Sequence, residues 1–201
     1  MTEAMPDARS ISTGIWVGVG GRDEAPALAG ASHFLEHLLF KGTPDRSASE
    51  IAEAVDAVGG EMNAYTTLEY TAFDTRLPAG RLELGLDLLC DVVQQPAFRS
   101  AELEAERQVI LEELLMEEDT PDDRVLGVLA EAQFPGHPLG REVLGTRETI
   151  SAMGGEAIRA FHDEWYRPAN LVVACAGAVD HDEVVAGAER RLGGLAGGAA
   201  P

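Results

Sequence analysis

The segment from Ala31 to Phe40 constrains the fold of this chain most strongly, because it places polar side chains of metal-binding type inside an apolar helix. Residues three and four positions apart share one face of an α-helix, so His33, Glu36 and His37 point the same way. Apolar neighbours predict that the helix is buried: Phe34, Leu35, Leu38, Leu39 and Phe40. A buried polar trio requires a partner, and a cation would supply one.

Zinc suits this trio of side chains. Histidines one helical turn apart have Cβ atoms roughly 5–6 Å apart. From that separation both ring nitrogens can reach one ion at about 2.0–2.1 Å. The alternative is a polar cluster in the core that is satisfied by hydrogen bonds without a metal.

A second acidic pair lies on the helix predicted over 100–119. This helix carries eight acidic residues, so its charge alone predicts a solvated face. Glu106 and Glu113 are nevertheless seven residues apart, along the same apolar stripe as Ile110. Two carboxylates on a core-facing stripe would be unfavourable without a cation, which a metal would again provide.

The charge balance of the 201 residues restricts the partners of the chain. Thirty-five acidic against 15 basic residues give a formal net charge of −20, which disfavours nucleic acid and anionic membranes. A basic peptide would be attracted, although a solubility adaptation explains the charge equally well. We expect no membrane span, because the longest apolar run is too short. A cytoplasmic location is the default expectation.

Periodicity and turn residues predict alternating helices and strands over most of the chain. They favour an α+β fold, with one mixed, largely antiparallel sheet and helices packed on one face. Ser47 and Glu50 form a capping box, and Ser100 is the expected cap of the acidic helix. The predicted strands are 11–20, 61–67, 70–77 and 170–179, and the predicted helices are 31–41, 47–58, 79–94, 100–119, 121–134, 147–153, 155–166 and 181–195.

These elements predict one domain over residues 10–195. We expect residues 1–9 to form a polar lead and residues 196–201 a flexible tail. The two cysteines lie among apolar residues and are expected to be buried thiols. The histidines outside the motif follow no ligand spacing and are expected on the surface or in loops: His137, His162 and His181.

Taken in order, several motifs resemble one family over about residues 10–195: the inverzincin zinc peptidases, which include pitrilysin, insulin-degrading enzyme and the mitochondrial processing peptidase. The motif His33-x-x-Glu36-His37 has the order of the inverzincin signature. The other segments similar to family landmarks are Gly59–Thr66, Glu106–Glu113, His137–Gly140, Leu144–Thr146 and Tyr166–Leu171.

The resemblance implies a zinc site and a reaction. It implies that His33, His37 and a downstream glutamate bind zinc and leave a fourth position for water, whose pKa zinc lowers to about 7. Glu113 is preferred to its rival Glu112, because Glu113 shares the stripe with Glu106 and Ile110. Glu36 would act as general base in peptide hydrolysis, and Glu106 resembles an acidic residue that supports the site.

The resemblance also implies how a peptide substrate binds. In this family an extended peptide adds to a sheet edge near the site, and Asn63 and Ala64 are the candidate contacts. Asn63 instead could satisfy a turn or the sheet edge.

The chain is expected to depart from the family in two respects. Family members usually begin with a strand before the one at 11–20, where this chain has only a polar lead. We also expect this chain to lack the second homologous domain that closes over the site. The missing half would be another part of a longer protein, a partner chain or a second copy, and a lone half is expected to have low activity. A non-catalytic peptide-binding or structural homologue, or a domain with a purely structural zinc, are the alternatives. The first is expected to have lost Glu36 or a ligand, and the second needs a fourth protein ligand.

Overall fold

The computed structural model describes residues 1–195, apart from the side chain of Asp123. The tail predicted over 196–201 lies outside the described residues. In chain order the helices and strands are β1 Thr2–Ala4, β2 Ser10–Val17, α1 Ala31–Leu39, α2 Ala48–Asp56, β3 Glu61–Thr66, β4 Thr71–Pro78, α3 Leu82–Gln94, α4 Ser100–Asp119, α5 Pro121–Gln133, α6 Arg147–Ala152, α7 Gly155–Trp165, β5 Leu171–Gly177 and α8 His181–Leu192, with short 3₁₀ turns between some of them.

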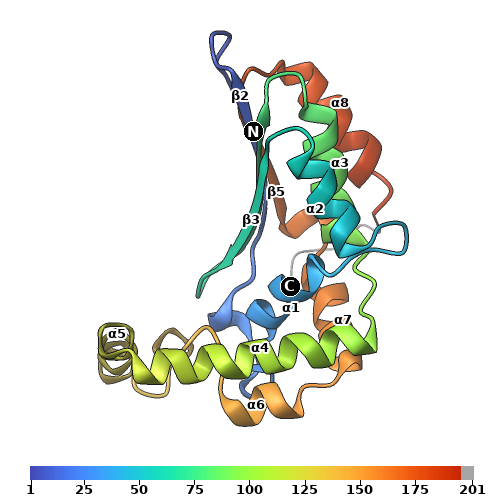
Figure 1. Ribbon diagram of the computed structural model, residues 1–201. Helices are drawn as coiled ribbons and strands as arrows, with labels where there is room; N and C mark the ends of the chain where they lie inside the picture. The colour runs from blue at the N-terminus through green and yellow to red at the C-terminus, as the bar shows by residue number, and fades with distance from the viewer. Residues whose placement is uncertain (196–201) are drawn as a thin grey trace.

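The strands form one sheet in the order β1-β5-β2-β4-β3. Only the β1–β5 pair among these is parallel, and β2 pairs antiparallel with both β4 and β5. The helices α2, α3 and α8 lie along one face of the sheet, while the other face carries no helix in this view (Figure 1). This arrangement confirms the predicted α+β class and the mixed, largely antiparallel sheet.

The core lies between the covered face of the sheet and the helices. In β2 the alternation buries Ile11, Thr13, Ile15 and Val17, because successive side chains of a strand point to opposite faces. Ile15 and Val17 belong to one cluster with fully buried side chains from α1, α3, α4 and β4, namely Phe34, Leu35, Leu89, Ile110 and Phe73. The motif helix α1 is therefore held on its apolar side by the centre of the core.

The long helix α4 crosses beneath α1 at one end of the sheet (Figure 1). Its buried residues Leu103 and Ile110 join the core. The buried guanidinium of Arg107 donates to the carbonyl oxygens of Ile150 and Met153, where α6 ends. These contacts fix the face of α4 that is turned toward α1.

Some local predictions are wrong. The lead at residues 1–9 contains the short strand β1, which pairs with β5. Helix α4 has Arg99 as its N-cap residue, without a side-chain capping bond, so Ser100 is not the cap. His162 is a core histidine rather than a surface one, since its Nε2 lies 2.8 Å from the carbonyl oxygen of Val93.

Other local predictions are confirmed. The Ser47–Glu50 capping box closes the start of α2. Both cysteines, Cys90 and Cys175, are buried and free. Across the described residues, none of the helices combines the length and apolar character that a bilayer crossing requires.

The start of α1 depends on a glycine, which gives a test of the fold. Gly30 has a φ of +91°, and an added Cβ would lie 2.6 Å from the carbonyl oxygen of Leu144. We expect Gly30→Ala to lower the free energy of unfolding by about 2–5 kcal/mol, because left-handed strain and overpacking add. Gly80→Ala is the matched control, since Gly80 has a φ of +82° with no atom within 4 Å of an added Cβ. Denaturant unfolding of both variants measures the difference, and equal losses would contradict the steric argument.

Candidate metal centre

Helix α1 presents its polar trio opposite its buried apolar side. Phe34, Leu35 and Leu38 are buried in the core, while the side chains of His33 and His37 are 15% and 16% exposed. Their ring nitrogens Nε2 lie 3.2 Å apart. The helix periodicity predicted from the sequence therefore brings both imidazoles to one point.

The start of this helix is held by a buried carboxylate. Both oxygens of Glu24 accept backbone amides at 2.7 Å, from Gly30 and from Ser32 in the first turn of α1. Burial raises the pKa of Glu24 to about 7, although the two amides and Arg141 act to lower it. Glu24 thus sets where α1 begins, and hence where His33 lies along it.

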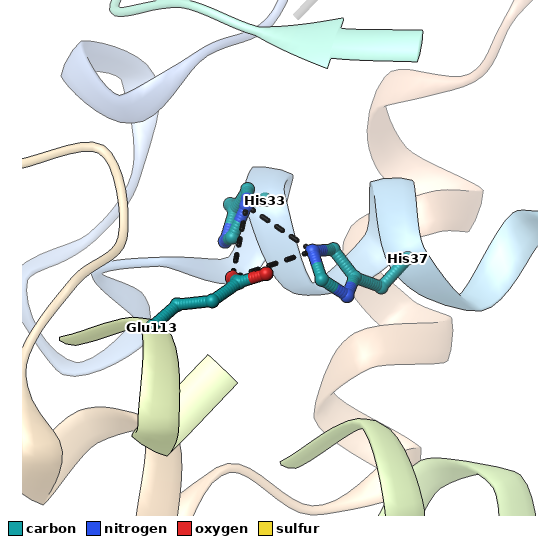
Figure 2. Close-up of side chains that lie close together, drawn as sticks. All are labelled: His33, His37 and Glu113. Atoms are coloured by element: carbon teal, nitrogen blue, oxygen red, sulfur yellow. Dashed lines mark hydrogen bonds and ion pairs between the residues drawn. The ribbon is translucent and has the colours of Figure 1, made fainter. Parts of the chain in front are cut away.

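Helix α4 brings a carboxylate to the two imidazoles (Figure 2). Glu113 Oε2 lies 3.8 Å from His33 Nε2 and 3.6 Å from His37 Nε2. Two ligand atoms at about 2.0–2.1 Å from a tetrahedral zinc are separated by roughly 3.3 Å, close to these distances. Among the side chains that the structure describes, these three are the one group of histidine, cysteine and acidic residues that could hold a metal.

The polar atoms of this group suit a cation. Glu113 Oε2 is buried without a hydrogen-bond partner among the described residues. Burial, together with the neighbouring His37, lowers the pKa of His33 to about 4, so the imidazole is neutral at pH 7. Neutral imidazole and carboxylate are the forms that ligate zinc, so the residues fit this ion.

Glu36 lies beside the candidate ligands but is not one of that group. The hydroxyl of Thr66, at the end of β3, donates to Glu36 Oε2 at 2.5 Å. Burial raises the pKa of Glu36, and the Thr66 hydrogen bond opposes this shift. The buried hydroxyl of Tyr166 has no hydrogen-bond partner among the described residues, and burial, with the nearby Glu36, raises its pKa.

Glu106 contacts the outer side of His37. Its Oε2 lies 3.1 Å from His37 Nδ1, and its Oε1 lies 2.8 Å from the ammonium nitrogen of Lys41. A carboxylate in this position orients a ligand imidazole and fixes which ring nitrogen faces the metal. The sequence analysis expected a cation beside Glu106, and the ammonium group of Lys41 lies there.

The predicted substrate residues lie on the outer strand of the sheet. Strand β3 pairs with β4 alone, so one side of its backbone is unpaired. The exposed Asn63 and the half-buried Ala64 are consecutive, and their side chains point to opposite faces. The structure brings this edge next to α1 through Thr66 and Glu36, and shows no hydrogen bond of the Asn63 side chain within the described residues.

The structure adds residues that the sequence analysis did not assign to the site. Lys41 lies four residues after His37, a helical spacing that could have indicated it. Thr66 stands at the end of the predicted Gly59–Thr66 landmark, but its bond to Glu36 requires the sheet to be placed. No sequence pattern indicates a role for Glu24 at the site, because this residue lies in a loop.

The fold and this ligand set define a protein of the inverzincin type, an α+β domain that carries a His-x-x-Glu-His helix. The profile of the insulinase family (peptidase family M16) matches residues 1–147, and that of the peptidase M16 inactive domain matches residues 153–201. The chain belongs to the insulinase family.

Similar proteins include longer chains. A protein of Mycobacterium leprae named as an uncharacterized zinc protease is 50% identical over 92% of this chain and 42% of its own length. A protein of Streptomyces coelicolor with the same description is 49% identical over 92% of this chain and 40% of its own length. The chain spans about two fifths of the length of these relatives.

Solved structures share the fold. A protease from Helicobacter pylori has the same fold, with a TM-score of 0.94 and 25% sequence identity. The match covers 100% of this chain and 49% of the Helicobacter pylori chain. Pitrilysin matches with a TM-score of 0.87 and 25% sequence identity, over 100% of this chain and 22% of the pitrilysin chain.

The buried Glu24 predicts a pH effect. The pKa of Glu24 is raised in the folded chain, so the folded chain binds this proton more tightly than the unfolded chain. The stability that protonated Glu24 contributes is therefore fully present below pH 4.5 and is lost as the pH rises through about 7. We expect the free energy of unfolding of the metal-free wild type to fall by about 3 kcal/mol relative to Glu24→Gln over this range. Glu53→Gln, at an exposed carboxyl, controls for the lost charge. A constant difference between wild type and Glu24→Gln would contradict the buried-carboxyl account.

The choice between adjacent glutamates gives a second test. We expect Glu113→Gln to lose most of the bound zinc after dialysis, because an amide replaces an anionic ligand. Glu112→Gln, at an exposed position one residue earlier, should retain it. Zinc content by atomic spectroscopy measures both, and the reverse order would identify Glu112 as the ligand.

Proposed function

We propose that this chain is the metal-binding domain of a zinc-dependent endopeptidase that hydrolyses unstructured peptides. The observation that carries the proposal is the close approach of His33, His37 and Glu113. Glu36 lies beside them on α1, the helix that carries both histidines. The names of the zinc protease relatives support zinc as the metal.

Three protein ligands leave room for water and substrate, which is typical of catalytic rather than structural zinc. Zinc bound here supplies a Lewis acid and a water of lowered pKa. No fourth candidate ligand joins the group among the described side chains, which disfavours a purely structural metal.

The chain's own residues carry the proton transfers. Glu36 accepts the proton of the attacking water and delivers it to the leaving amine of the cleaved peptide bond. The hydroxyl of Thr66 holds one carboxylate oxygen of Glu36, so the other remains available for the water. Glu106 orients His37 and takes no part in bond cleavage.

The unpaired edge of β3 suits an extended peptide, which would add to the sheet there by main-chain hydrogen bonds. A cavity of about 430 Å³ borders Asn63 and Met62, and one of about 510 Å³ borders Glu113 and Leu126. Each cavity borders a candidate site residue, and both would accept side chains of such a peptide. The net charge of −20 favours basic sequences.

A second homologous half would complete the enzyme, and this half would be another part of a longer protein, a partner chain or a second copy. Three observations support it. The chain spans under half of the relatives and of the Helicobacter pylori protease. The side chain of Glu113 is 37% exposed. Helix α5 exposes Val125, Leu126, Val128 and Leu129 by half or more, an apolar surface suited to a protein contact.

Replacing the proposed base tests the mechanism. We expect Glu36→Gln to retain zinc but to cleave an unstructured basic peptide about 10²–10⁴-fold more slowly than the wild type, because general base catalysis is lost. Peptide cleavage followed by mass spectrometry, with zinc content measured in parallel, gives the result. Wild-type rates in a zinc-loaded Glu36→Gln variant would overturn the role of Glu36. The chain alone is expected to be slow, so the comparison requires high enzyme concentration and long incubation.

A further inference from the structure

Lys41 is the only lysine among the 201 residues, and all of the other 14 basic residues are arginines. It follows the end of α1, and its backbone N–H donates to the carbonyl oxygen of Leu38 at 3.1 Å. Its ammonium nitrogen lies 2.8 Å from Glu106 Oε1. The one lysine of the chain therefore stands at the candidate metal centre.

We propose that Lys41 is a positioning residue that acts through Glu106 on the metal ligand His37 and raises the affinity of the centre for zinc. The proposal rests on the proposed function, because it takes zinc as the ion held by His33, His37 and Glu113. It assigns a role to Lys41 that neither the motif spacing nor the ligand geometry gives.

The first argument is charge. Glu36, Glu106 and Glu113 bring three carboxylates to a partly enclosed site, and a zinc ion carries only two positive charges. Lys41 supplies the remaining positive charge, and within the described residues no arginine forms an ion pair with these three carboxylates. Because the side chain of Glu106 is only 8% exposed, an uncompensated charge there would be unfavourable.

The second argument is the use of the two oxygens of Glu106. Lys41 takes Oε1, and Oε2 remains free to accept from His37 Nδ1. This bond keeps the proton on Nδ1 and turns Nε2 of His37 toward Nε2 of His33. A guanidinium tends to bind both oxygens of a carboxylate and would compete with His37, whereas an ammonium is a compact point charge.

The test is zinc affinity, measured on the metal-free chain by competition with a chromophoric chelator. We expect Lys41→Met to weaken zinc binding about 10–100-fold, as is usual when a group supporting a metal ligand is lost. Arg46→Met is the matched control: it removes one positive charge five residues away, where Arg46 pairs with Asp87 and Asp91, and should leave the affinity unchanged.

A double-mutant cycle distinguishes action through Glu106 from a general electrostatic effect. If Lys41 acts through Glu106, adding Lys41→Met to Glu106→Gln should change the affinity less than about 2-fold. An undiminished loss in the Glu106→Gln background, or wild-type affinity in Lys41→Met, would overturn the proposal. If the wild type itself binds no zinc, the proposed function fails instead, so the two failures are distinguishable.

The single lysine also allows a test in the folded wild type, in case Lys41→Met does not fold. Acetylation with an amine-directed reagent modifies only Lys41 and the terminal amine of Met1. Acetylated wild type should show the same 10–100-fold loss of zinc affinity. Acetylation at Met1 alone, separated by chromatography and verified by mass spectrometry, should leave the affinity intact. An unchanged affinity in the doubly acetylated protein would contradict the role of Lys41.

Discussion

The structure depends on one constraint, which is that the carboxylates gathered between α1 and α4 must be compensated by positive charge. The apolar sides of both helices are fixed in the core by residues such as Phe34 and Ile110. This leaves the partly buried His33, Glu36 and His37 facing the buried Glu106 and the partly exposed Glu113. The fold therefore brings these groups together first, and a cation at their centre stabilises what would otherwise be a costly arrangement.

Much of the fold could be predicted, because its elements are encoded by local periodicity. The alternation in β2, the Ser47–Glu50 capping box and the apolar stripe of α3 each specify an element without reference to the rest of the chain. Strand β1 escaped prediction because it has only three residues, Thr2–Ala4, with no apolar alternation, and they form a strand by pairing with β5. The buried position of His162 is likewise set by its contact with Val93, far away in sequence.

The same distinction holds for the site. The trio on α1 and the pair on α4 were predictable, because spacing on a helix determines which side chains share a face. Groups that contact the site from other helices, strands or loops could not be predicted in this way. Thr66 reaches Glu36 only because β3 lies beside α1, and Glu24 caps α1 only because its loop returns to the start of that helix. Sequence spacing thus identifies the candidate ligands, while the groups that hold them in place can be found only in the tertiary fold.

The exposed fraction differs among the side chains of the candidate metal centre. Glu106 is 8% exposed, and the two histidines are nearly as enclosed, but Glu113 is 37% exposed. Glu106, paired with Lys41, contacts the Nδ1 side of His37, whereas the cavity that borders Glu113 extends to Leu126 of α5. The residues that line this cavity do not include His37, Lys41 or Glu106. A ligand in this cavity would contact Glu113 without contacting the ion pair of Lys41 and Glu106, so its binding and the orientation of His37 can be independent of each other.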